Sequence, residues 1–145
     1  MTEPDPSEER ARPGFFVHVV PALLYVVAVF YSGAAKVSLP RIDMPIPEDK
    51  VAHFVIFGVM VFVVYHALAF ELAEWKRARL IVASVIVASA LGGLLELVQY
   101  TIPYRDAEFL DWVADTLGAL LSAGILRLLK PGPSEPTTLE PAQRE

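Results

Sequence analysis

The sequence contains no cysteine and few charged residues, and each scarcity excludes a class of protein. Without cysteine, the chain has no disulfide, no thiolate zinc site and no cysteine nucleophile. Charged residues make up 20% of the chain and hydrophobic residues 54%, which is too little charge to cover a soluble domain. The net charge of -5 provides no basic surface for nucleic acid. The composition therefore indicates a protein whose main partners are membrane lipids, and no nucleic acid is expected.

Four long apolar stretches occupy most of the chain. Each is about as long as the 20 residues that an α-helix needs to cross a bilayer, and none alternates as a strand would. They cover residues 14–34, 51–70, 80–100 and 109–129. Because lipid cannot satisfy free backbone groups, helix is the expected spanning form. The sequence thus predicts an all-α fold, an integral membrane four-helix transmembrane bundle forming one domain over residues 14–130.

The two ends of the chain differ from the middle. Residues 1–13 and 131–145 are polar, contain several prolines and have few large apolar groups, so both tails are expected to be disordered. Lys and Arg near the helix ends set orientation in the membrane. They are more numerous on the side of the termini, and densest at Lys76, Arg77 and Arg79. We therefore predict a multi-pass protein with both termini in the cytoplasm.

With the helices placed alternately up and down, nearly all ionisable groups in or beside the spans fall at the outer face. Asp49 and His53 are four residues apart, as are Asp111 and Asp115, so each pair can share a helix face. The face of the second pair continues through Gly118, and small residues let helices pack closely. The acids are therefore expected to point inward. The candidate ligand-binding residues are Asp49, Lys50, His53, Glu96, Gln99, Arg105, Asp111 and Asp115.

These polar residues have structural explanations as well as functional ones. A carboxylate at membrane depth costs at least roughly 2.5–3.5 kcal/mol, so it needs a partner or a proton. Glu96 and Gln99 can have a purely structural role, as polar contacts between helices. Asp111 can be a solvated helix N-cap, and Asp49 an acid favoured by the helix dipole. The functional interpretation rests on three helices placing charge at the same end.

Three motifs in this region resemble those of the VanZ-like family. They are DKxxHF at residues 49–54, ExxQ at 96–99 and, after Arg105, LDxxxDTLG at 110–118. Many relatives have Asn where this chain has Asp115, which adds one potential charge. The resemblance implies a small polytopic protein of the bacterial cytoplasmic (inner) membrane. The family is named for low-level resistance to the glycopeptide teicoplanin, which implies a link to the cell envelope.

Three functions from different classes follow. In the first, Lys50, His53 and Arg105 bind an anionic envelope lipid or peptidoglycan-precursor head group at the outer face, with the acids orienting them; such binding could change glycopeptide susceptibility. The second is an intramembrane enzyme with His53 as general acid–base and Glu96 or Asp111 as further catalytic candidates. In the third, the polar cluster only locks the bundle of a structural or partner protein. One histidine among acids is a weak zinc pattern, so neither metal nor cofactor is predicted.

Overall fold

Four helices account for nearly all of the residues that the structure describes. In this computed structural model those residues are 6–35 and 47–129, with side chains described from residue 16 onward. The helices are α1 Pro6–Ala34, α2 Glu48–Glu71, α3 Arg77–Tyr100 and α4 Phe109–Leu128. Each contains a segment long and apolar enough to cross a membrane, which in α1 begins at Phe16. The predicted all-α bundle of four transmembrane helices is therefore confirmed.

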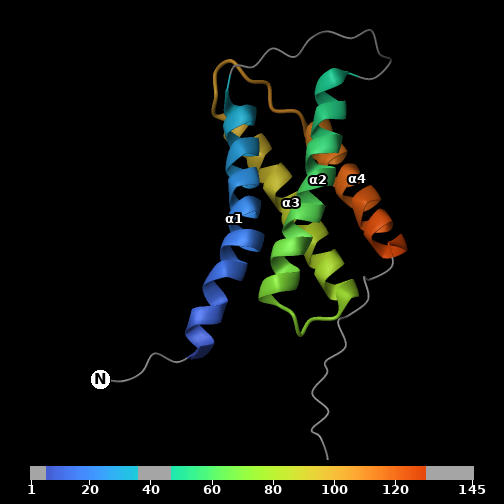
Figure 1. Cartoon of the computed structure of the whole chain (residues 1–145). Helices are drawn as coiled ribbons and strands as arrows, with labels where there is room; N and C mark the ends of the chain where they lie inside the picture. Colours follow the sequence, from blue (N-terminus) through green and yellow to red (C-terminus); the bar gives the residue numbers. More distant parts are fainter. Residues whose placement is uncertain (1–5, 36–46, 130–145) are drawn as a thin grey trace, which may run out of the picture.

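The helices run alternately up and down, so α1 and α3 end where α2 and α4 begin (Figure 1). Residues 101–108, which join α3 to α4, lie at this end of the bundle, which we call the loop end. Residues 72–76, which join α2 to α3, lie at the opposite end, called the turn end. α2 contacts all three other helices, whereas α1 contacts α2 and α3. The start of α1 and the end of α4 share the turn end, as the predicted topology requires.

Three helices begin earlier than the apolar stretches predict. α2 begins at Glu48 instead of residue 51, and α3 at Arg77 instead of residue 80. α1 begins at Pro6, so residues 6–13 are helical where composition suggested a disordered tail. Glu, Ala and Arg in that segment favour helix, and proline is tolerated at the first helical position. Hydropathy marks where the hydrocarbon starts, whereas a helix can continue into water. The predicted tail at 131–145 lies outside the described residues.

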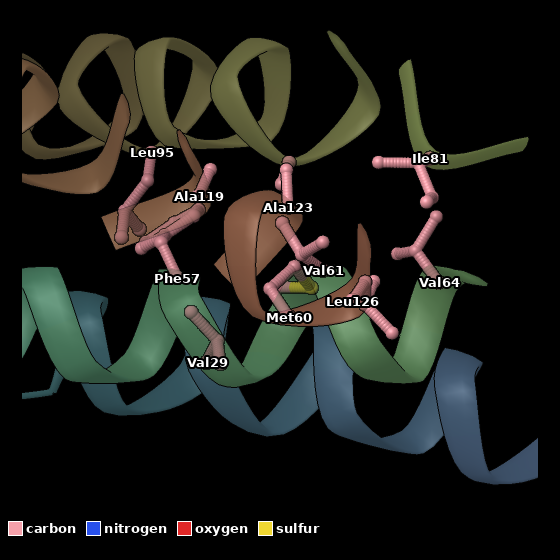
Figure 2. Close-up of a cluster of buried hydrophobic side chains, with 11 residues drawn as sticks. Val29, Phe57, Met60, Val61, Val64, Ile81, Leu95, Ala119, Ala123 and Leu126 are labelled. Atoms are coloured by element: carbon pink, nitrogen blue, oxygen red, sulfur yellow. The ribbon is translucent and has the colours of Figure 1, made fainter. Parts of the chain in front are cut away.

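The apolar core lies in the middle of the bundle and is built around α2 (Figure 2). Phe57, Met60 and Val61 of α2 are almost completely buried, and they pack in one cluster with Leu95 of α3 and Ala119 of α4. Many other large apolar side chains are exposed on the outside of all four helices. Soluble monomers rarely expose apolar surface of that extent, whereas lipid covers it without cost. The core and the outer surface therefore both fit a membrane bundle.

Glycines bring α4 close to α2 and α3. A Cβ atom on Gly118 would overlap the backbone carbonyl oxygen of Phe54 in α2. A Cβ atom on Gly92 of α3 would lie 2.5 Å from Oδ2 of Asp115. Asp111 and Asp115 are both buried on this face of α4. The expectation that the acid-bearing faces are the packing faces is confirmed for α3 and α4, whereas Asp49 at the start of α2 is exposed.

At the turn end, Arg77 joins the start of α3 to the end of α4. Its Nη2 donates hydrogen bonds to the backbone carbonyl oxygens of Leu126 and Leu129, the second at 2.7 Å. The last carbonyls of a helix have no partner inside it and carry the negative end of its dipole, so a guanidinium group suits them. The sequence indicated only a topological role for Arg77. The structure adds a packing role, because the bonded carbonyls belong to another helix.

We expect Arg77→Ala to lower the free energy of unfolding by about 1.5–3 kcal/mol, the range for hydrogen bonds to a charged group. Thermal unfolding in detergent, followed by circular dichroism, measures the change. Arg79→Ala is the matched control, because the Arg79 guanidinium lies 5.1 Å from the centroid of the Trp75 ring and, among the described residues, makes no hydrogen bond to a helix-end carbonyl. A cation–π contact at such a site contributes about 0.5–1 kcal/mol. Equal losses in the two variants would contradict the role given to Arg77.

Candidate functional site

Polar side chains from α2, α3, α4 and the 101–108 loop gather at the loop end of the bundle. The structure places all eight predicted site residues there, in three connected groups. Lys50 forms the first group with Asp49 and Asp111, and His53 forms the second with Asp115 and Glu96. The third group is made by Gln99 and Arg105, which bind the end of α1. The clustering inferred from the motifs is thus present, although the partners within it were not predictable.

Lys50 is the counter-ion of three carboxylates. Its Nζ lies 2.8 Å from Asp111 Oδ1, 2.7 Å from Glu108 Oε2 and 3.5 Å from Asp49 Oδ2. Of its three N–H donors, two make hydrogen bonds, to Asp111 and Glu108, while Asp49 adds a longer ion pair. The Asp111 side chain is 7% exposed and ion-paired, which excludes the solvated N-cap role. Lys50 therefore ties the start of α2 to the start of α4, and its charge is already balanced.

His53 and Asp115 form the deeper contact between α2 and α4. His53 Nδ1 lies 2.9 Å from Asp115 Oδ1, and the Asp115 side chain is fully buried. The absence of a side chain at Gly92 makes room for this carboxylate. A buried acid bonded to one ring nitrogen fixes the orientation of an imidazole. The other ring nitrogen is then the one available for a proton or a ligand.

Glu96 enters the same group from α3. Its Oε2 accepts a hydrogen bond of 3.0 Å from the backbone N–H of Glu108. Among the described residues, Glu96 Oε1 and Asp115 Oδ2 are buried and have no hydrogen-bond partner. One ligand atom each from His53, Glu96 and Asp115 lies within 4.8 Å of the others, a spacing at which they could hold a metal ion. A second such set consists of Asp49, Glu108 and Asp111, and Lys50 is bonded to all three of its members.

The end of α1 is part of the site. Its Gly33 carbonyl oxygen accepts hydrogen bonds from Gln99 Nε2 at 3.1 Å and Arg105 Nε at 2.8 Å. Arg105 Nη2 also donates to the Ser32 carbonyl at 3.2 Å, and Tyr104 Oη to the Ala34 carbonyl at 3.2 Å. Carbonyls at a helix C-terminus need external donors, and the loop supplies them. Arg105 therefore holds α1 against the loop end of the bundle.

Sequence reasoning missed two contributors to the site. The α1 carbonyls carry no residue signature, because every residue type has a carbonyl. Glu108 is not among the predicted site residues, yet its side chain pairs with Lys50 and its backbone N–H binds Glu96. Its position three residues before Asp111, near a helix start, was the available signal. Such a residue lies on the same side of the first turn as the predicted acid.

A cavity of about 170 Å³ opens among α1, α2 and α3 at this end. One part of its lining is polar and includes Asp49, His53, Gln99 and Arg105. The other part is apolar, and its side chains come from Val29, Ile56, Phe57 and Leu95. Complete small-molecule sites typically measure about 300–1,000 Å³, so this cavity suits part of a larger molecule. Its two-sided lining suits a polar group joined to an apolar chain.

Four apolar helices, with a cluster of ion pairs and a cavity at one end, define a small polytopic membrane protein. A family model described as VanZ/LLP1 matches residues 28–130, which include the end of α1 and all of α2, α3 and α4. The chain belongs to this VanZ-like family. No curated protein and no solved structure matches it.

Proposed function

We propose that this VanZ-like protein binds the anionic head group of a cell-envelope lipid, such as a lipid-linked peptidoglycan precursor, in the cavity at the loop end. The observation that carries the proposal is the lining of that cavity. Arg105 and His53 stand beside its polar part, while Phe57 and Leu95 line its apolar part. A phosphate or pyrophosphate joined to a hydrocarbon chain has the same division, so the head group would meet Arg105 and His53 and the chain would follow the apolar wall.

Arg105 is the side chain best placed to bind the phosphate. Lys50, which the sequence also offered for this role, is occupied by its three carboxylates. Arg105 uses Nε and Nη2 for carbonyls of α1, and within the described part of the chain its Nη1 makes no hydrogen bond. Guanidinium groups match phosphate oxygens in geometry and stay charged. His53, in the same lining, would supply a second contact.

The loop end is proposed to face outward from the bacterial cytoplasmic membrane, with both termini in the cytoplasm. The distribution of basic residues supports this orientation. Lys76, Arg77 and Arg79 lie at the turn end, and Arg127 is in the last turn of α4 at that same end. Lys and Arg favour the cytoplasmic side of a membrane. Binding of a peptidoglycan precursor there would change susceptibility to glycopeptides such as teicoplanin, because those antibiotics act outside the same membrane.

The test compares geranylgeranyl pyrophosphate with geranylgeraniol, which has the same chain and no phosphate, on purified protein in nanodiscs. We expect the pyrophosphate to bind preferentially. Arg105→Ala should weaken its binding at least about tenfold, because a hydrogen bond to a charged group contributes about 1.5–3 kcal/mol. Titration followed by native mass spectrometry gives both affinities.

Tyr104→Phe is the matched control. It removes the neighbouring hydrogen bond to α1 without removing charge, so it separates loosening of α1 from loss of the guanidinium. Tyr104→Phe should bind the pyrophosphate as the unaltered chain does. Equal binding of the alcohol, or unchanged affinity in Arg105→Ala, would refute the proposal. If Arg105→Ala then lost stability alone, the result would favour a cluster that only locks the bundle.

A reaction that releases phosphate from the bound head group is the second candidate function, and the position of His53 favours it. The ring lines the cavity and is held at Nδ1 by a buried carboxylate, as a general acid–base would be. Incubating the nanodiscs with geranylgeranyl pyrophosphate and measuring released phosphate tests this. Release that His53→Gln abolishes would establish an enzyme, and intact lipid would leave binding as the function.

A further inference from the structure

The two acidic sets at the loop end differ in one respect. The set formed by Asp49, Glu108 and Asp111 surrounds the Lys50 ammonium group, which supplies its cation. The set formed by His53, Glu96 and Asp115 has no such group. Throughout residues 16–35 and 47–129, no Lys or Arg side chain forms an ion pair with Glu96 or Asp115. The deeper set therefore contains two carboxylates without a fixed cation.

Burial makes that lack of a cation costly. Glu96 is 9% exposed and Asp115 is 0% exposed, and both lie on helices that span the membrane. Each has one oxygen, Oε1 of Glu96 and Oδ2 of Asp115, that is buried without a partner among the described residues. Buried charges in proteins are paired, or they coordinate metals. Two orphaned oxygens beside one imidazole are the pattern that a missing cation would leave.

We propose that His53, Glu96 and Asp115 bind a divalent metal ion. The three residues come from α2, α3 and α4, and each offers one ligand atom within 4.8 Å of the other two. Ligands at about 2.0–2.2 Å from an ion lie roughly 3–4.4 Å from one another, so small side-chain rotations complete the site. The ion balances the two carboxylate charges while the imidazole remains neutral. The ion would also join α2, α3 and α4 at a point deeper in the bundle than the Lys50 ammonium group.

The ligand set indicates the class of ion. Imidazole nitrogen favours zinc and other transition metals, while carboxylate oxygen also suits manganese. Three protein ligands leave at least one coordination position for water or a ligand oxygen, as in catalytic metal sites. His53 lines the cavity, which provides the entry path that a buried site needs. The open position would then face the same space as Arg105.

The neighbouring residues already hold two of the three ligands in place. The Glu108 backbone N–H binds Oε2 of Glu96 and leaves Oε1 free for the ion. Gly92 leaves space for the Asp115 carboxylate, and a Cβ atom at that position would displace it. Partners of this kind orient metal ligands and tune their affinity. The backbone around the three ligands, and not only the ligands themselves, therefore suits a metal site.

Metal content of the full-length protein tests the proposal directly. The protein is purified in detergent, stripped with a chelator, then dialysed separately against Zn²⁺, Mn²⁺, Mg²⁺ and Ca²⁺, and retained metal is measured by mass spectrometry of the elements. We expect about one Zn²⁺ or Mn²⁺ ion per chain. Glu96→Gln and Asp115→Asn should reduce retention to background. Adding the retained ion back to stripped protein should raise its unfolding temperature, but should not raise that of either variant.

Glu108→Gln is the matched control, because it removes an acid from the Lys50 set and leaves the backbone N–H that binds Glu96. It should keep both the ion and the metal-dependent rise in unfolding temperature. The proposal is overturned if the unaltered protein retains none of the four ions. It is equally overturned if Glu108→Gln loses the ion while Glu96→Gln and Asp115→Asn keep it. No lipid is used, so these results are independent of head-group binding.

Discussion

The Gly118→Ala substitution is expected to separate α4 from α2 and to lower stability sharply. A Cβ atom at this position would overlap the Phe54 carbonyl oxygen, which belongs to the backbone and cannot rotate away as a side chain could. Overpacking of a core costs about 1–3 kcal/mol even where side chains can adjust. The loss here should be at the top of that range or above it. Thermal unfolding in detergent, followed by circular dichroism, measures the change.

Gly124→Ala, on the same helix, is the control for this experiment. A Cβ atom at Gly124 would meet nothing within 4 Å. Alanine is the better helix former by up to about 1 kcal/mol, so stability should be unchanged or slightly higher. Similar losses at the two positions would mean that the contact with Phe54 does not determine the effect.

The sequence predicted the packing of α4 well because helical periodicity maps position onto face. Residues three or four apart lie on one side of a helix, so the spacing of Asp111, Asp115 and Gly118 alone assigns them to a common surface. All three are buried in the structure. The alternating direction of the helices placed His53 of α2 and Glu96 of α3 at the loop end. Periodicity and the alternating direction of the helices were sufficient for this part of the site.

The partners of these residues could not be predicted, because they depend on rotation and depth of one helix against another. Lys50 was equally compatible with binding a ligand and with binding acids, and only the 2.7 and 2.8 Å contacts decide between the two. The role of the Gly33 carbonyl is invisible in the sequence, because it is a backbone group. The orphaned oxygens of Glu96 and Asp115 are also a property of the assembled bundle.

Loss of the Lys50 charge is expected to have the second large effect on stability. In the Lys50→Met variant the Asp111 carboxylate, 7% exposed, would remain buried without its ammonium partner. Removing one member of a buried ion pair typically costs about 3–5 kcal/mol. Because the Lys50 side chain is 18% exposed, we expect a loss near the lower end, about 3 kcal/mol. Thermal unfolding of the variant measures it.

Two further variants separate this effect from general loss of packing. Glu108→Gln removes a carboxylate that is 48% exposed, and exposed pairs contribute about 0–1 kcal/mol, so its loss should be small. The double substitution Lys50→Met with Asp111→Leu replaces the buried pair by apolar groups. It should recover most of the stability, because the cost lies in the unpaired charge and not in the absent contact. If the double variant were less stable than Lys50→Met, Asp111 would have another partner, and the division of the loop end into two acidic sets would have to be abandoned.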